Sequence, residues 1–573
     1  MGGGRVLAHD GGVNKSVRAG VAGVFAAAVA LGVAEVVAFA TGPLSAPLLA
    51  VGGVVVDNVP PGVKNIGVAV FGVHDKTALL TGTAVLLAAY AWGVGVLALR
   101  SWPAALGGIA LFGAIGAAAA LTRHDAGVLS ALPSLIGAAV AVPVLRYLLT
   151  LATASPTPVA TAPATTGEAT AAAITGGPTA SATGGGTTAT GPVVAGGGAQ
   201  AGPERQGPVP APGGPGTAYP QESRRRFLRG LGLVGAIAVV SGVAGRLLTS
   251  RRAVTAARDA VVLPPPVAAA PPVPANAQAP GAVPYVTGND DFYRIDTSLY
   301  PPQIDPANWQ LKIFGMVRNP ITLSWDDLLR RPMIERYVTL ACVSNEVGGN
   351  LISNALWLGT PIKALLDEAQ PLPGADQVVQ RSVDGWTCGS PTATLTDGRD
   401  ALLAIGMNGR PLPVEHGFPV RMVVPGLYGY VSACKWIIEI ELSRFADFDA
   451  YWVPRGWSQQ APIKTESRID TPRDGATRRA GTVVVAGVAW AQHRGIRGVE
   501  VQVDGGTWEP ATLYGTVSAD TWREWSYAWA ATPGRHTVRV RATDSTGETQ
   551  PSTPAPPEPN GATGWHAVHI TVE

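Results

Sequence analysis

The 573-residue chain has only three cysteines, and charged residues make up just 14% of it. Three thiols cannot form the disulfide framework that stabilises small secreted domains. The net charge is +2, so no bulk basic charge indicates binding to nucleic acid. The sequence also lacks a Cys-x-x-Cys-His haem motif, a cysteine set for an iron–sulfur cluster and a credible nucleotide-binding fold. Any redox chemistry would therefore need a separate electron-transfer partner.

Long apolar runs are abundant instead, because hydrophobic residues make up 47% of the chain and the mean hydropathy is +0.21. Within residues 1–150, four runs are each long enough to cross a bilayer as a helix. These runs are residues 19–40, 77–99, 104–121 and 126–149. A shorter run, 48–56, cannot cross and is predicted to be re-entrant or interfacial. Residues 1–150 are therefore predicted to be a four-helix transmembrane region.

This region is predicted to be an anchor or a partner-binding unit whose N-terminus lies in the cytoplasm. Basic residues gather on one side of the spans, as the positive-inside rule requires of cytoplasmic loops. The residues concerned are Lys15, Arg18, Arg100 and Arg146. A haem in the membrane would need axial ligands inside the spans, but His74 and His124 fall at loop edges.

A twin-arginine export signal is predicted within residues 223–250. Ser223-Arg-Arg-Arg-Phe-Leu-Arg229 is followed by an apolar run from 231 to 248. This bacterial route carries folded proteins, and a chain needs it mainly when a cofactor is inserted in the cytoplasm first. The alternative is a basic flank on an ordinary transmembrane helix. The segment is predicted to be a fifth span that places the rest of the chain on the extracytoplasmic side of the cytoplasmic membrane.

Segments of biased composition lie on both sides of this fifth span. Residues 151–222 are dominated by Ala, Thr, Gly and Pro, and such a sequence cannot bury enough apolar surface to offset its ordering entropy. They are predicted to be a disordered cytoplasmic linker. Residues 251–284 are rich in proline and alanine and are predicted to be a second tether, which leads to a globular region.

The globular region divides into two parts. Residues 285–461 mix strand and helix patterns without regular alternation, which predicts an α+β domain, with Ser324 as a helix N-cap. Its clearest β-prone runs are residues 309–315, 336–342 and 418–424. Residues 462–573 show short alternating strands separated by turn-rich gaps, and this spacing predicts an all-β, immunoglobulin-like sandwich.

Cys342 is the main candidate for chemistry. A buried cysteine is by default inert packing. Cys342, however, ends a predicted strand and opens a glycine-rich loop, where backbone amides can approach a ligand closely. A thiolate at that position would suit a soft or high-valent metal.

Several motifs, taken in order, resemble the sulfite oxidase family of molybdopterin enzymes. They are Thr339-Leu-Ala-Cys-Val-Ser-Asn345, Trp357-Leu-Gly-Thr-Pro-Ile-Lys-Ala-Leu-Leu366, His416-Gly-Phe-Pro-Val-Arg421, Val424-Pro-Gly426 and Lys435-Trp436. The resemblance covers about residues 292–573. It implies a sulfite-oxidase-like molybdopterin domain, the family's dimerisation domain after it, and a molybdenum cofactor with one molybdopterin.

The resemblance also implies roles for individual residues. Cys342 is the implied metal ligand, and Arg294 is implied to face the metal pocket from the first cofactor loop. The implied cofactor-binding residues are His416, Arg421, Lys435, Ser344 and Asn345. Such a set suits a phosphate, because an arginine offers a planar fork of donors and a lysine offers a point charge.

The chain departs from the family on the substrate side. Glu346 and Val347 stand where sulfite oxidases carry arginines for their anionic substrate, and a carboxylate there would repel sulfite. Asp296 stands where the family usually has histidine. The family's active-site tyrosine has no secure counterpart. The candidates for its place are Tyr428, Tyr430, Tyr451 and Trp457. An uncharged or cationic substrate, such as a sulfoxide, is therefore as compatible with the sequence as sulfite.

Together these features predict a membrane-anchored molybdopterin-dependent oxidoreductase of a bacterium. It would carry out two-electron oxo transfer on a small molecule, with a sulfur compound as one candidate, outside the cytoplasmic membrane. An electron-transfer partner and a homodimer contact through residues 462–573 are expected. The alternative is a non-catalytic, membrane-tethered scaffold whose molybdopterin domain has degenerated.

Overall fold

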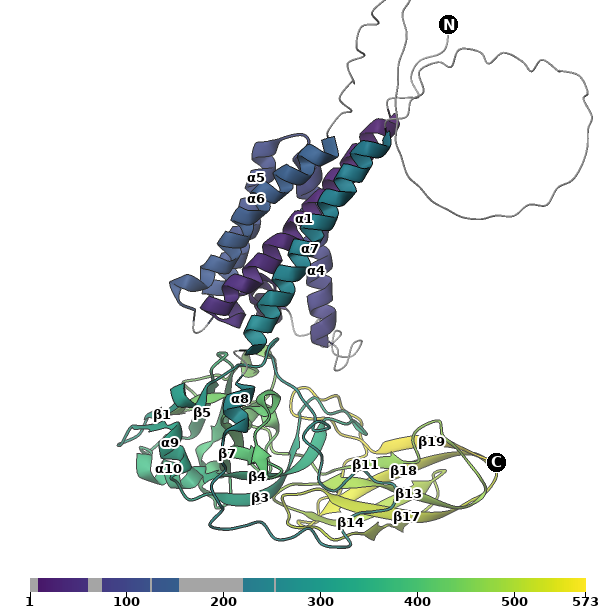
Figure 1. Ribbon diagram of the computed structural model, residues 1–573. Coiled ribbons are helices and arrows are strands. Elements are labelled where there is room, and N and C mark those ends of the chain that lie inside the picture. The colour runs from purple at the N-terminus through teal and green to yellow at the C-terminus, as the bar shows by residue number, and fades with distance from the viewer. Residues whose placement is uncertain (1–8, 60–74, 124–125, 154–219, 252–253) are drawn as a thin grey trace, which may run out of the picture.

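The computed structural model describes residues 9–59, 75–123, 126–153, 220–251 and 254–573 (Figure 1). It contains a helical bundle, an α+β domain and a β-sandwich, as predicted. In Figure 1 the bundle sits over the α+β domain, and the yellow sandwich lies to one side, away from the bundle. Most of the predicted linker lies outside the described residues, as do His74 and His124.

Six helices form the bundle, among the residues that the structure describes. They are α1 (His9–Thr41), α2 (Pro47–Asn58), α4 (Asp75–Leu97), α5 (Trp102–Leu121), α6 (Leu132–Thr153) and α7 (Pro220–Arg251). All except α2 contain a stretch long and apolar enough to cross a membrane, in agreement with the five predicted runs. The buried faces are mostly alanine and glycine, so the helix backbones can approach closely.

Two five-stranded sheets build the α+β domain. One sheet has the strand order β2-β1-β10-β5-β6. The other has the order β3-β4-β7-β8, and its fifth strand, β9, also pairs with β7. The strands are β1 (Gln310–Gly315), β2 (Ile321–Ser324), β3 (Ile334–Ala341), β4 (Ile352–Pro361), β5 (Gln377–Ser382), β6 (Thr387–Pro391), β7 (Leu402–Met407), β8 (Arg410–Pro411), β9 (Arg421–Val423) and β10 (Ile437–Ser443). Ser324 caps helix α9 (Trp325–Leu329) through a capping box with Asp327, which confirms the predicted N-cap.

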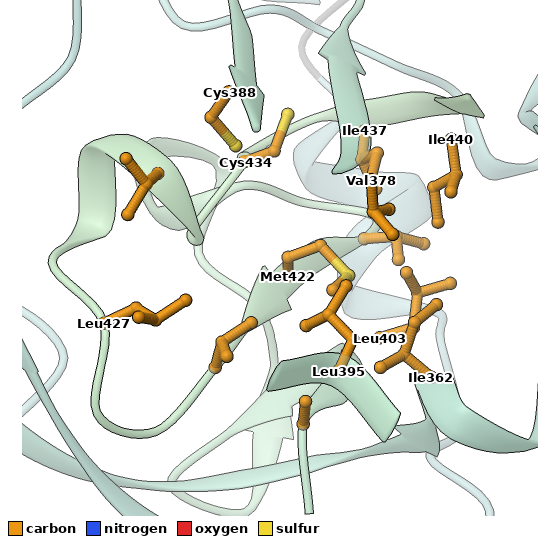
Figure 2. Close-up of a cluster of buried hydrophobic side chains, with 14 of the residues drawn as sticks. Ile362, Val378, Cys388, Leu395, Leu403, Met422, Leu427, Cys434, Ile437 and Ile440 are labelled. Carbon is orange, nitrogen blue, oxygen red and sulfur yellow. The ribbon is translucent and has the colours of Figure 1, made fainter. Parts of the chain in front are cut away.

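Apolar side chains from both sheets meet the helices α10 (Ile362–Ala369) and α11 (Thr392–Thr396) in one core. Figure 2 shows part of this core, with Cys388 and Cys434 side by side at its edge. Both thiols are free and fully buried, and they lie within hydrogen-bonding reach of each other. These two cysteines therefore pack as small apolar groups.

Two sheets face each other in the C-terminal sandwich, with the orders β11-β13-β17-β16 and β12-β19-β18-β14-β15. The strands are β11 (Glu466–Thr471), β12 (Thr477–Arg478), β13 (Gly481–Trp490), β14 (Ile496–Val503), β15 (Trp508–Pro510), β16 (Thr512–Leu513), β17 (Arg523–Ala531), β18 (Gly534–Asp544) and β19 (His566–Val572). The sandwich contacts the α+β domain at β3, where Gln492 Nε2 donates to Thr339 O at 2.9 Å.

Residues 254–284 differ from the predicted tether, because they pack along the α+β domain. After the short helix α8 (Thr255–Asp259), the Val267 N–H donates to Met333 O at 2.8 Å, and Ala268 O accepts from the Glu335 N–H at 2.9 Å. Val261, Leu263, Val273 and Val283 pack against the core. Their apolar side chains, spaced between prolines, have partners that composition alone does not reveal.

Candidate cofactor-binding site

Cys342 lies directly after β3, at the first position of a tight loop. The Cys342 N–H donates to Leu351 O at 2.9 Å, and Cys342 O accepts from the Asn345 N–H at 3.1 Å. Asn345 Oδ1 accepts from the Leu351 N–H at 2.8 Å, so this side chain ties the two ends of the loop together. Burial raises the pKa of the Cys342 thiol, and hydrogen bonds from Ser344 oppose that rise. Ser344 and Asn345 thus shape the loop around the sulfur.

Arg421 and Lys435 come together because the chain folds tightly at Gly417. Gly417 has a φ of 110°, and a Cβ there would lie 3.0 Å from Arg421 Cβ and 3.1 Å from Lys435 Cβ. Only glycine meets both requirements without strain. Arg421 and Lys435 also form a backbone bridge between β9 and the residue pair before β10. The His-Gly-x-Pro-x-Arg motif therefore sets two cations side by side.

Arg421 is a buried cation with a solvent exposure of 5%. Its Nη1 donates to His416 O at 3.1 Å, its Nε donates to Met422 O at 3.3 Å, and its Cζ lies 5.0 Å from the centre of the Trp357 ring. Within the described part of the chain, no carboxylate forms an ion pair with it. Burial lowers the pKa of Arg421 to about 10. A buried charge without a counterion is costly, so this guanidinium fits an anionic ligand.

His416 lies beside this cation in a neutral form. Its Nε2 is 3.0 Å from Asn289 O, and its ring meets Phe292 edge to face at 5.4 Å between centroids. Burial lowers the pKa of His416 to about 3, with further lowering by Arg421 and then Lys435. Because a carbonyl can only accept, Nε2 carries the ring proton. Nδ1 is therefore an acceptor.

Lys435 shares one carboxylate with Arg294. Lys435 Nζ donates to Asp296 Oδ2 at 2.6 Å and to Glu415 O at 3.2 Å, while Arg294 Nε donates to the same Oδ2 at 3.0 Å. Burial lowers the pKa of Lys435 to about 8, although Asp296 opposes this. Asp296, the residue in the family's histidine position, thus orders both cations. Arg294 is about one-third exposed at this end of the site.

Two tyrosines lie close to Cys342. Burial raises the pKa of Tyr293, and Cys342 raises it further while Arg421 lowers it, so this phenol lies near both groups. Burial also raises the pKa of Tyr428, followed by the effects of Glu466 and, less strongly, Cys342. Sequence reasoning missed Tyr293, although it directly precedes Arg294 in the first cofactor loop.

The other candidates for the active-site tyrosine have partners elsewhere. The Tyr430 hydroxyl donates to Ser458 O at 2.7 Å, and the Tyr451 hydroxyl donates to Asp57 Oδ1 at 3.1 Å. Trp457 packs against Tyr430, with 5.6 Å between ring centroids. Glu346, in the loop after Cys342, is exposed.

Comparisons with known proteins identify the family. A model described as the oxidoreductase molybdopterin binding domain matches residues 298–452, and a bacterial Ig domain model matches residues 466–540. Sulfite oxidase of Gallus gallus is 30% identical over 339 residues, which are 49% of this chain and 72% of that protein. The chain belongs to the sulfite oxidase family of molybdopterin oxidoreductases. Cys342, His416, Arg421 and Lys435 all lie within the matched molybdopterin domain, whereas Arg294 precedes it.

Other relatives match over a smaller share of their length. Mitochondrial sulfite oxidase of Homo sapiens is 31% identical over 354 residues, which are 52% of this chain and 64% of the human protein. The chain thus spans less than two-thirds of that relative. The crystal structure of the sulfane dehydrogenase SoxCD from Paracoccus pantotrophus aligns with a TM-score of 0.44 at 23% identity, covering 50% of this chain and 83% of that one.

The residues present fit the family's cofactor, molybdenum held by one molybdopterin. Arg421 is a buried guanidinium that lacks an anion in the described structure, and Lys435 and Arg294 add two cations against the single carboxylate of Asp296. A phosphate group would supply the missing negative charge. Cys342 is a free thiol, the ligand type that a soft or high-valent metal prefers.

Proposed function

We propose that this chain is a membrane-anchored oxidoreductase that transfers an oxygen atom to or from a small molecule with the exchange of two electrons. The carrying observation is the buried, unpaired Arg421 beside Lys435 and His416 in the molybdopterin-binding domain. When bound, the cofactor supplies the two-electron redox change and the oxygen-atom transfer. The chain's own residues then bind, orient and enclose it.

Each site residue has a separate task in this proposal. Cys342 provides the protein's sulfur ligand, and because burial raises its thiol pKa, metal binding must displace the proton. Arg421 and Lys435 hold the phosphate, and neutral His416 accepts a hydrogen bond at Nδ1. Tyr293 and Tyr428 contribute phenol groups close to the sulfur, where they can hold or pass a proton.

We infer that the substrate is an uncharged or cationic sulfur compound rather than sulfite. The loop that follows Cys342, residues 343–350, contains no lysine or arginine, and Glu346 is its only charged residue. The loop itself would therefore offer sulfite no cation, and Arg468, whose Nη1 donates to Gly349 O of this loop at 2.8 Å, is already paired with Asp470. Electrons would pass to a separate carrier, and a second copy of the chain would pair through residues 462–573.

An extracytoplasmic location is supported by the N-terminal half of the chain. The five apolar helices have the length to span a bilayer, and α7 carries the arginines of the proposed export signal and its apolar run in one continuous helix. Arg225 and Arg226 are exposed on that helix. The α+β domain follows its C-terminal end, so one crossing by α7 would carry this domain to the outer side.

The test is elemental and pterin analysis of the full chain purified in detergent. About one molybdenum and one pterin per chain are expected, and Cys342→Ser should lower the metal content and abolish turnover with sulfoxide or sulfite, assayed in both redox directions. Replacing Arg224 and Arg225 with lysine should leave the α+β domain on the cytoplasmic side of the membrane. A wild-type chain without molybdenum or pterin would instead indicate a non-catalytic scaffold.

A further inference from the structure

The short helix α2 contacts the α+β domain through its single acidic residue, Asp57. Asp57 Oδ1 accepts from the Tyr451 hydroxyl at 3.1 Å, and its backbone O accepts from Arg455 Nη2 at 3.0 Å. On the bundle side, Arg123 Nη1 lies 3.2 Å from Asp57 Oδ2 and also donates through Nη2 to Ala50 O at 3.4 Å. One carboxylate thus links the bundle to the α+β domain, and it is fixed from both sides.

A second contact brings α2 onto the first cofactor loop. A Cβ added at Gly52 would lie 2.9 Å from Leu299 Cδ1, so this glycine lets the leucine side chain rest on the helix backbone. Leu299 comes three residues after Asp296, the carboxylate that orders Arg294 and Lys435. The segment from Asp296 to Leu299 therefore contacts Lys435 at one end and α2 at the other.

Both contacts connect to the surroundings of the Lys435–Asp296 pair. The Tyr451 N–H donates to Thr387 Oγ1 at 3.0 Å, next to the turn that carries Asp384. Burial raises the pKa of Tyr451, followed by Asp57 and, less strongly, Asp384. Burial likewise raises the pKa of Asp384, and Asp296 and Lys435 are close enough to shift it too. Tyr451 is therefore near Asp57 and Asp384, and Asp384 is near the Lys435–Asp296 pair.

We propose that α2 covers the Lys435–Asp296 end of the cofactor site, so that the docked domain retains a cofactor that the undocked domain releases. This proposal rests on the proposed function, since it concerns the ligand of that same site. It also sets an order of assembly, because a domain already covered by α2 could not take up its cofactor at this end. Loading must then precede docking, which suits export of a folded and loaded domain.

A reversible disulfide cross-link tests, in the full chain, whether α2 covers the cofactor site. Gly52→Cys with Leu299→Cys places two thiols where the glycine and leucine now touch, and the three native cysteines are buried. In detergent, a mild oxidant should join the new pair. We expect the joined protein to release pterin and molybdenum, followed over time into excess buffer, about tenfold more slowly than the same protein after reduction. The Leu299→Cys single variant, treated identically, should show no difference.

A second variant removes a contact between α2 and the α+β domain. Asp57→Asn combined with Tyr451→Phe should lower the yield of the cross-link. It should also speed release of the cofactor about tenfold, the effect of losing one charge-assisted hydrogen bond. Asp367→Asn is the matched control, because Asp367 pairs with Lys363 at 2.6 Å on the exposed surface of α10. It should leave release unchanged.

Three results would refute the proposal that α2 covers the cofactor site. The first is failure of the cross-link to form, and the second is equal release from the joined and reduced proteins. The third is loss of the cross-link in the Asp57 variant with no change in release. A wild-type chain without molybdenum or pterin would refute the proposed function itself, and a cross-link that still formed would distinguish that outcome from a failure of docking.

Discussion

The unpaired charge of Arg421 predicts that Arg421→Met has little effect on the stability of the cofactor-free protein and destabilises the loaded protein. In the cofactor-free chain, burial lowers the pKa of Arg421 from 12.5 to about 10. Keeping the buried side chain protonated therefore reduces the free energy of unfolding by about 3 kcal/mol. Methionine removes this cost but loses two hydrogen bonds from the charged guanidinium to carbonyl groups, each worth about 1.5–3 kcal/mol. These contributions are of similar size and opposite sign, so the cofactor-free variant should differ little in stability from wild type.

In the loaded chain the same substitution removes the phosphate's guanidinium partner. A hydrogen bond between this guanidinium and a phosphate contributes about 1.5–3 kcal/mol more, so the loaded variant should lose at least that much stability beyond the cofactor-free one. The assay is denaturation followed by tryptophan fluorescence in detergent, on protein made with and without molybdopterin synthesis in the host. We expect a melting temperature close to that of wild type without cofactor and a clearly lower one with it.

Arg494→Met is the matched control for this experiment. Arg494 lies in the β-sandwich, and its Nε pairs with Oδ2 of the buried Asp544 at 2.7 Å. Its replacement leaves a buried carboxylate unpaired and should destabilise both forms alike. If Arg421→Met destabilised both forms to the same extent, Arg421 would be an ordinary structural cation, and the argument for a phosphate at this site would be refuted.

Two further predictions concern stability. Burial raises the pKa of Glu466 to about 8, and its Oε1 has no hydrogen-bond partner within the described structure. Folding therefore favours the protonated acid, and stability should fall as pH rises from about 4.5 to 8. Glu466→Gln should remove this loss, which is worth about 4 kcal/mol between pH 5 and 8.5, in urea denaturation at pH 5, 7 and 8.5. Equal slopes in variant and wild type would contradict this. Ser324→Ala removes the capping box of α9 and should cost about 1 kcal/mol at every pH, so a change below about 0.3 kcal/mol would show that the cap contributes nothing.

Local signals were sufficient for much of the fold. The five long apolar helices follow from length and hydropathy, and the Ser324 cap follows from hydrogen bonding within four residues. The strand predicted at 418–424 is shorter, at Arg421–Val423, because Gly417 turns the chain and Pro419 lacks an N–H for the ladder. Elements set by neighbouring residues were predictable, and their ends depended on single residues that break the pattern.

Contacts between distant segments were not predictable in this way. Asp57 and Tyr451 are almost 400 residues apart, and neither lies in a pattern that indicates the other. Residues 254–284 have the composition of a tether, yet their apolar side chains have partners on the α+β domain. Resemblance found Cys342, Arg421 and Lys435 because they belong to motifs, while Tyr293 gains its importance only from the groups placed around it.

The charges of the site are divided between its two ends. At the cofactor end, Arg294, Arg421 and Lys435 face one paired carboxylate, Asp296, while burial raises the pKa of Asp384 and so favours its neutral form. That end carries net positive charge, which a phosphate can neutralise.

At the substrate end, the loop after Cys342 has no cation and presents only the exposed Glu346. An anionic substrate would be drawn to the cofactor end, which the cofactor's own phosphate would occupy. An uncharged molecule meets no such competition at the sulfur. In the proposed function, the cations assigned to the cofactor would therefore not be available to bind sulfite, because the phosphate would already neutralise them.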